Sequence, residues 1–99
     1  MSVITAERLA DVVRSIPPGQ WMTYGDVAPL CGGTDRHART LNQRFIRHQM
    51  AGAHRVLMAG GTVGQTALGA PEEVRARLRA EGLTFVAGKA DPARRLHAQ

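Results

Sequence analysis

Three short stretches of this sequence hold the residues whose types and spacing could do chemistry. The first, Thr23-Tyr24-Gly25-Asp26-Val27-Ala28, carries a phenol at the start of an expected helix, where backbone N–H groups favour a phosphate. The second, Arg36-His37-Ala38-Arg39, carries two guanidinium groups, which suit phosphate recognition. The third, Gly52-Ala53-His54-Arg55-Val56, sets a histidine and an arginine after an alanine. The methyl group of Ala53 has no chemistry, so any function must come from the groups around it.

The charge of the chain favours a polyanionic partner. The formal net charge is +5, from 13 Lys+Arg against 8 Asp+Glu, and 12 of the 13 basic residues are arginine. On charge alone, nucleic acid is as good an explanation as the arginine enrichment of a GC-rich genome. The length of 99 residues fits one domain with a modest core.

Several classes of site and location are disfavoured by what the sequence holds. Cys31 is the only cysteine, which excludes an internal disulfide, and such a residue is commonly an inert buried side chain. The four histidines show no metal-ligand spacing, so we expect neither a metal nor a cofactor. No signal-peptide pattern opens the chain and no apolar run is long enough to span a membrane. We therefore expect a cytoplasmic protein, associated with the nucleoid if its source is bacterial.

Helical periodicity and turn residues predict an α+β fold, mainly α: a winged helix-turn-helix-like domain with a small β-hairpin. Thr5 can cap a first helix that ends before Pro17-Pro18-Gly19. Thr23 and Asp26 form a capping-box-like start for a short second helix, which Gly32-Gly33 closes.

A third helix is expected from Thr34 or Asp35 to about His48, with opposite apolar and polar faces. The apolar face holds Ala38, Leu41, Asn42 and Phe45, and the polar face holds Arg36, Thr40, Gln43 and Arg47, with Arg39 at the flank. A short helix, a glycine-bearing turn and a second helix with a basic outer face are the pattern of a helix-turn-helix.

The second half of the chain predicts smaller elements. Residues 56–63, with Gly60-Gly61 in their middle, indicate a hairpin or wing. Pro71 fits the first position of a last helix, which Gly82 stops. A single short strand is expected over residues 83–86.

The chain is thus predicted to hold one domain over residues 1–88 and a basic flexible tail over residues 89–99.

The order and spacing of the three stretches resemble the DNA-binding domain of the O6-alkylguanine-DNA alkyltransferases, over roughly residues 9–83. In that family the third stretch is Pro-Cys-His-Arg-Val, and its cysteine takes an alkyl group from damaged guanine. Here Ala53 stands in the cysteine's position and Gly52 in the proline's. The chain is most similar in pattern to an alkyltransferase-like protein, which keeps the damage-binding domain and lacks the acceptor.

The resemblance implies roles for particular residues. Tyr24 would press on the phosphate beside the lesion, and Arg39 would fill the gap left by a base that is flipped out of the stack. The DNA-binding residues implied are Thr23, Tyr24, Arg36, Arg39 and Gln43, and the lesion-pocket residues implied are Tyr24, Ala53, His54, Val63, Gly64 and Thr66. For Tyr24 the alternative is a helix tyrosine half buried on the core, and for the arginines it is a solvated surface charge.

His54 and Glu81 match the residues that draw the proton from the thiol in the alkyltransferases. Without a thiol they have no proton to move, so we expect them to serve as packing and hydrogen-bonding groups. Arg55 is expected to form an ion pair or to cap a carbonyl group.

Two departures from the family are the shorter segment between Arg39 and Ala53, and a pocket-edge loop over residues 63–69 that lacks the usual aromatic residue and serine. Loss of the sulfur at Ala53 should also leave extra volume for bulkier adducts.

The resemblance predicts a non-enzymatic damage sensor, and we expect it to act as a monomer with no membrane association. Its partner would be double-stranded DNA containing O6-alkylguanine, and nucleotide excision repair damage-recognition proteins would receive the lesion. Two alternatives stay open: an enzyme with an unsuspected acceptor such as Cys31, and a winged helix-turn-helix regulator that reads undamaged sequence.

Overall fold

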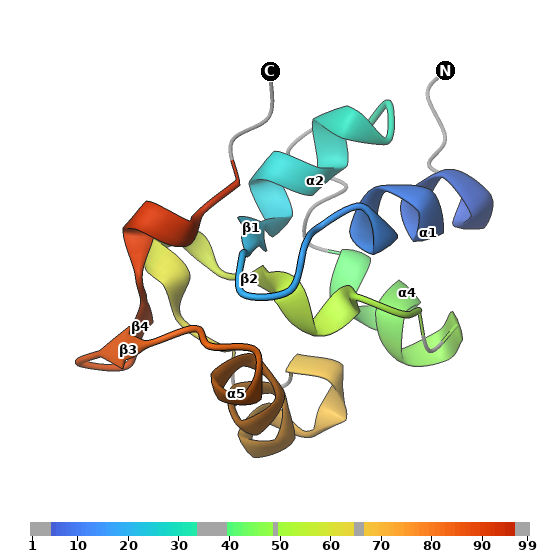
Figure 1. Cartoon of the computed structure of the whole chain (residues 1–99). Coiled ribbons are helices and arrows are strands. Elements are labelled where there is room, and N and C mark those ends of the chain that lie inside the picture. Colours follow the sequence, from blue (N-terminus) through green and yellow to red (C-terminus); the bar gives the residue numbers. More distant parts are fainter. Residues whose placement is uncertain (1–4, 34–39, 49, 65–66, 97–99) are drawn as a thin grey trace.

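The structure, a computed structural model, describes residues 5–33, 40–48, 50–64 and 67–96. Within these ranges the chain is mainly α-helical with two short sheets, one lying among the helices and one at an edge of the molecule, so the predicted mainly α, α+β class is confirmed (Figure 1). In chain order the elements are α1 (Ala6–Arg14), β1 (Met22–Thr23), α2 (Tyr24–Leu30), α4 (Leu41–His48), the 3-10 helix η1 (Ala53–Arg55), β2 (Val56–Leu57), the 3-10 helices η2 (Ala59–Gly61) and η3 (Ala67–Gly69), α5 (Pro71–Ala80), β3 (Phe85–Val86), β4 (Lys89–Ala90) and the 3-10 helix η4 (Pro92–Arg94). In the described ranges no helix combines the length and apolar character needed to cross a bilayer.

Helix starts follow the capping residues predicted from the sequence. The Thr5 hydroxyl accepts a hydrogen bond from the Arg8 N–H at 3.2 Å at the start of α1. Thr23 and Asp26 form a full capping box at α2, each side chain accepting from the other residue's N–H at 3.0 Å. Pro71 occupies the first turn of α5, as predicted.

The helix-turn-helix is described in part. Its first helix is α2, and the turn after it closes through Gly32, whose φ is +84°. The expected third helix is present as α4 over its C-terminal half, with Leu41 and Phe45 buried as its predicted apolar face requires. Helix α4 begins at Leu41, directly after the non-helical Thr40, so the prediction of one continuous helix from Thr34 or Asp35 to about His48 is wrong at its start. The predicted capping residues Thr34 and Asp35 themselves lie outside the described residues.

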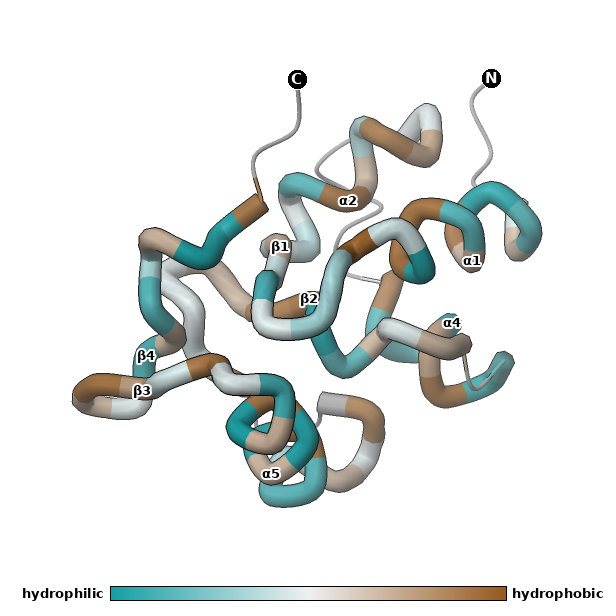
Figure 2. Tube along the Cα trace, in the orientation of Figure 1, coloured by the Kyte–Doolittle hydropathy of each residue, from teal (hydrophilic) through white to brown (hydrophobic). Residues whose placement is uncertain are grey.

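Two buried clusters form the core, and the small parallel sheet lies between them. Along the helices, hydrophobic and hydrophilic residues alternate as in amphipathic helices with one buried face, and α5 is mostly hydrophilic (Figure 2). The first cluster holds Leu9, Val13, Ile16, Met22, Val27, Ala28, Cys31, Leu41, Phe45, Ala53 and Val56. The second holds Trp21, Leu57, Val63, Val74, Leu78, Leu83 and Ala90. Successive strand residues point to opposite faces, which is why Val56 joins the first cluster and Leu57 the second.

The predicted hairpin over residues 56–63 is wrong. Strand β2 pairs instead with β1 in parallel, with Met22 opposite Val56 and Thr23 opposite Leu57. Val56 and Leu57 are both buried, a pattern of a strand covered on two faces rather than of a wing with one wet face. The parallel pairing ties the segment before Tyr24 to the segment after Ala53.

A hairpin does form, further along the chain. Strands β3 and β4 pair in antiparallel fashion, where the sequence predicted a single strand. Ala87 and Gly88 connect them with φ values of +53° and +79°, the left-handed pair that a tight hairpin turn uses.

The basic tail predicted over residues 89–99 also needs correction, because residues 89–96 are part of the folded domain. Ala90 is 1% exposed within the second cluster, and Leu96 packs against the first. The buried Trp21 indole donates to the Asp91 carbonyl at 2.9 Å, a partner that a buried indole N–H needs. The two partners are so distant in sequence that local patterns could not reveal the contact.

Gly52 is held in a conformation that only glycine adopts easily. Its φ is +88°, and a Cβ placed there would lie 2.5 Å from the Val13 carbonyl oxygen. Proline, whose φ is fixed near −65°, cannot adopt this conformation. The glycine that replaces the family's proline is therefore required by the backbone path of this chain over the end of α1.

We expect Gly52→Ala to destabilise the fold by more than the conformational strain alone, which is roughly 1–2 kcal/mol. Gly32→Ala is the matched control, because Gly32 has a φ of +84° with nothing within 4 Å of the added Cβ. Urea denaturation of both variants measures the difference. Equal losses of unfolding free energy would show that the contact with Val13 does not constrain the loop.

Candidate functional site

Ala53 opens the 3-10 helix η1, directly after the tight backbone at Gly52 and before β2. The residue is 2% exposed and belongs to the first core cluster. The extra volume expected at this position is therefore not open to solvent in the free protein. Any group that reaches Ala53 must first displace part of the packing above it.

The Glu81 carboxylate binds the next two residues of η1. His54 Nε2 lies 2.7 Å from Glu81 Oε2, and the Arg55 guanidinium donates to both carboxylate oxygens at 3.0 and 2.7 Å. Arg55 also donates to the Ile16 carbonyl at 3.0 Å, so it makes both of the contacts expected of it. The Gly19 N–H donates to Glu81 Oε1 at 3.4 Å. This network joins η1, the end of α5 and the connection between α1 and β1.

The network fixes the charge of Glu81. The hydrogen bonds from Arg55 outweigh the burial that would raise the pKa of Glu81 and, with those from His54 and Gly19, lower it to about 2. The side chain is 17% exposed, and that of His54 is 11% exposed. The geometry gives His54 and Glu81 a structural role that does not need an acceptor thiol.

Tyr24 is the first residue of α2, directly after the capping residue Thr23. It is half buried, and its ring stacks on the Phe45 ring with centroids 6.2 Å apart. Burial raises the pKa of the Tyr24 phenol, which stays protonated and able to donate a hydrogen bond. Packing on the core and contact with a ligand are thus compatible for this residue, since packing uses the ring and a ligand contact would use the hydroxyl group.

The predicted polar face of the third helix is described only in part. Gln43 and Arg47 are exposed on α4, whereas Arg36 and Arg39 lie outside the described residues. Asn42, on the inner side of α4, accepts a hydrogen bond from the Leu68 N–H at 3.0 Å. Its position on the apolar face of the helix was the signal that could have identified this role, because a polar side chain there needs a partner.

The described part of the predicted pocket-edge loop contacts both the core and the two neighbouring helices: Val63 belongs to the second core cluster, and η3 contacts α4 and α5. Val63 is 7% exposed in that cluster, and Gly64 lies so close to Met58 that a Cβ would be 3.2 Å from its sulfur. Thr66 lies outside the described residues. Leu68 has a φ of +51°, an uncommon conformation for leucine that the bond to Asn42 helps to hold.

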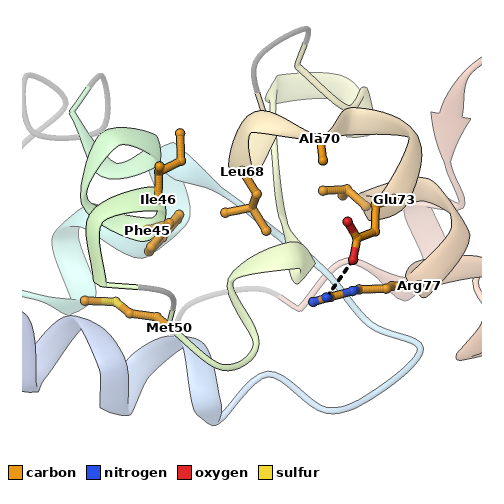
Figure 3. Close-up of a pocket in the computed structure, with 8 residues that line it drawn as sticks. Phe45, Ile46, Met50, Leu68, Ala70, Glu73 and Arg77 are labelled. Atoms are coloured by element: carbon orange, nitrogen blue, oxygen red, sulfur yellow. Dashed lines mark hydrogen bonds and ion pairs between the residues drawn. The ribbon is translucent and has the colours of Figure 1, made fainter.

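A pocket of about 430 Å³ opens beside η3, between α4 and α5 (Figure 3). Six of its eight lining residues have apolar side chains, and the other two, Glu73 and Arg77, form an ion pair (2.8 Å) on one side. The lining residues are Phe45, Ile46, Met50, Leu68, Ala70, Glu73, Val74 and Arg77. None of the predicted lesion-pocket residues within the described part of the chain is among them. Sequence reasoning missed these residues because apolar side chains at helical spacing look the same in a core and in a pocket wall.

The remaining candidates are inert in this geometry. Cys31 is 2% exposed, and burial raises the pKa of its thiol, as expected of a packing residue. Among the described residues, no cluster of three histidine, cysteine, aspartate or glutamate side chains could hold a metal ion.

Comparison with known proteins assigns the chain to a family. The family model of the 6-O-methylguanine DNA methyltransferase DNA-binding domain matches residues 5–83, which is most of the chain. The chain belongs to this family. The match includes Tyr24, η1 and Glu81, so the network described above lies inside the family domain.

Two relatives show how the family domain is used elsewhere. A methylated-DNA–protein-cysteine methyltransferase of Methanothermobacter thermautotrophicus is 39% identical over 57 residues, 58% of this chain. The match spans about a third (32%) of that protein's length. The crystal structure of S. pombe Atl1 in complex with damaged DNA containing O6-carboxymethylguanine has a TM-score of 0.72 at 26% identity. That match covers 93% of this chain and 94% of Atl1, so the two folds agree over nearly their full lengths.

The low pKa of Glu81 predicts a specific loss of stability in acid. A carboxylate whose folded pKa is below its ordinary value of 4.5 stabilises the fold fully above that pH. Its contribution is lost as the pH falls towards about 2. We expect the free energy of unfolding in urea to fall by on the order of 3 kcal/mol from this group across that window.

Glu81→Gln should flatten the acid part of this pH dependence. Glu72→Gln, with a side chain 87% exposed, is the matched control and should keep it. A Glu81→Gln variant that loses as much stability in acid as the unchanged protein would contradict the assignment.

Proposed function

We propose that this protein is a non-enzymatic sensor of DNA damage that binds duplex DNA and holds O6-alkylguanine without repairing it. The observation that carries the proposal is the agreement in fold with Atl1, whose structure contains DNA with O6-carboxymethylguanine. An alkylated base would be flipped out of the stack and received among Tyr24, Ala53, His54, Val63, Gly64 and Thr66, where the packing would have to open on binding because Ala53 is 2% exposed without DNA. The cost of extruding a base is a few kcal/mol, which the contacts with the protein must offset.

The absence of alkyl transfer follows from Ala53. By its motif, Ala53 occupies the position of the acceptor cysteine, and a methyl group cannot form a thioether. The methyltransferase relative argues for keeping the enzymatic alternative in view. Its acceptor would have to be Cys31, and a buried thiol with a raised pKa is a poor nucleophile.

The contacts with DNA are assigned by their positions in the family pattern. The Tyr24 hydroxyl would donate to the phosphate beside the lesion, and Arg39 would fill the gap in the base stack. Thr23, Arg36 and Gln43 would contact the DNA around them, with the phosphate contacts supplying affinity that is independent of sequence. The basic net charge of +5 supports this assignment.

A sensor that does not repair must pass its lesion to other proteins. We infer that nucleotide excision repair damage-recognition proteins receive it, that the sensor acts as a monomer, and that it works in the cytoplasm, on the nucleoid if its source is bacterial.

Lesion recognition predicts tighter binding to a duplex with one O6-methylguanine than to the same duplex with guanine. Fluorescence anisotropy measures both affinities at one salt concentration, because the affinity of a protein for DNA depends strongly on salt. Equal affinity for the two duplexes would rule out the sensor and favour a regulator that reads undamaged sequence. Selection from random undamaged duplexes would then reveal a preferred site.

Variants at Tyr24 and Arg39 extend this comparison. Tyr24→Phe keeps the ring on Phe45 and removes only the hydroxyl group, whereas Tyr24→Ala removes both. We expect Tyr24→Phe and Arg39→Ala to reduce the lesion preference while much of the salt-dependent background binding remains. A Tyr24→Phe variant with unchanged preference would assign Tyr24 to packing alone.

The protein should carry no alkyl group after incubation with alkylated DNA. Intact-protein mass spectrometry measures this, with an active alkyltransferase as the positive control. An adduct in stoichiometric amount on Cys31 would restore the enzymatic alternative, and Cys31→Ser would identify the site.

A further inference from the structure

The carboxylate of Asp26 is bound on both oxygens. Its Oδ2 atom accepts from the Thr23 N–H at 3.0 Å and from Arg95 Nε at 2.9 Å, and its Oδ1 atom accepts from Arg95 Nη2 at 2.8 Å. The Asp26 side chain is 16% exposed and that of Arg95 is 34% exposed. This is the two-pronged geometry in which a guanidinium group holds a carboxylate most firmly.

The segment that carries Arg95 is fixed from both sides. The Trp21 N–H donates to the Arg94 carbonyl at 3.2 Å, and the Leu96 N–H donates to the Trp21 carbonyl at 2.7 Å. The Arg95 guanidinium also lies over the Trp21 ring, 6.0 Å from its centre. The backbone on each side of Arg95 is therefore anchored to the residue that precedes β1, and the side chain is aimed at Asp26.

Asp26 belongs to the same short helix as Tyr24, within its first turn. Burial would raise the pKa of Asp26, but the hydrogen bonds from Arg95 and Thr23 outweigh it and lower that pKa. The carboxylate is therefore ionised at neutral pH. Without Arg95 it would be a bare negative charge on an element that, under the proposed function, meets a polyanion.

We propose that Arg95 is a positioning residue for DNA binding: it neutralises Asp26 and holds the start of α2, so that Tyr24 can meet a DNA phosphate. The inference rests on the proposed function, since that function brings DNA to α2. It assigns the segment over residues 89–96 to the binding machinery as a support rather than as a contact.

The test compares Arg95→Gln with Arg94→Gln. Both variants remove one positive charge from neighbouring positions, and the Arg94 side chain is exposed. Anisotropy with undamaged and O6-methylguanine duplexes measures affinity, and thermal denaturation establishes that each variant is folded at the assay temperature. We expect Arg95→Gln to bind both duplexes about fivefold to tenfold more weakly than Arg94→Gln does, a range typical of modest coupling between sites. Equal binding by the two variants would overturn the proposal.

A double variant separates charge from architecture. Asp26→Asn keeps an oxygen that can accept from the Thr23 N–H. It removes the negative charge that would have no cationic partner in Arg95→Gln. The double variant should therefore bind DNA more tightly than Arg95→Gln alone, whereas a purely structural role for Arg95 predicts no recovery. A double variant that binds no better than Arg95→Gln would refute the charge-neutralising role.

The same data distinguish this inference from the proposed function. If the unchanged protein binds damaged and undamaged duplexes equally, the sensor proposal fails. The difference between Arg95→Gln and Arg94→Gln on undamaged DNA still tests the role of Arg95.

Discussion

The arrangement of the site depends on the hydrogen bonds that the Glu81 carboxylate accepts. It accepts from His54, from both prongs of Arg55 and from the Gly19 backbone, and so joins three separate parts of the chain. A buried carboxylate is tolerated only when such partners compensate for the water it has lost, and removing one partner leaves the others uncompensated. The three side chains therefore depend on one another. Their presence needs no catalytic explanation.

This interdependence bears on the histidine–arginine pair of the motif. By the resemblance, a histidine at the position of His54 would be part of the chemistry around a thiol in an alkyltransferase, together with the glutamate at the position of Glu81. Here His54 and Arg55 hold η1 against the end of α5, and Arg55 also caps the Ile16 carbonyl. A chain could lose its acceptor and keep both residues for stability alone. Whether the family's alkyl transfer can occur is therefore better judged from the residue at position 53 than from the presence of His54.

Local signals in the sequence predicted local structure well. The caps at Thr5 and Thr23 were predicted because each acts within three residues of itself. Pairing of β1 with β2 was not predicted, because strands this short have no periodicity and parallel partners lie far apart in the chain. The contact of Trp21 with Asp91 was missed for the same reason of distance. For Asn42, helical spacing placed the side chain correctly on the inner face of the third helix, but it could not identify Leu68 as the hydrogen-bond partner.

The roles of the candidate site residues stay predictions, and the motif revealed little of the packing around these residues. The motif located Tyr24 and Ala53, but it did not reveal that Ala53 is buried or that the open pocket lies between α4 and α5. Burial depends on how the shortened connection passes over α1 at Gly52, which is a property of the packed chain. A motif transfers residue types between relatives more faithfully than it transfers the volume around them.

The effect of an arginine on the binding of a polyanion depends on where it lies in the fold and on which carboxylate it pairs with. Arg55 and Arg95 each bind a carboxylate of the same fold through two hydrogen bonds, so their charges are largely matched before any ligand arrives. Arg14, Arg75 and Arg77 pair with acidic neighbours on their own helices, where exposed pairs contribute little to stability. The net charge still attracts a polyanion from a distance, since pairing does not change the sum. What pairing changes is where a phosphate can approach closely, because it covers the carboxylates that would otherwise repel it. Under the proposed function, an arginine paired within the fold, such as Arg95, would therefore affect DNA binding without touching DNA.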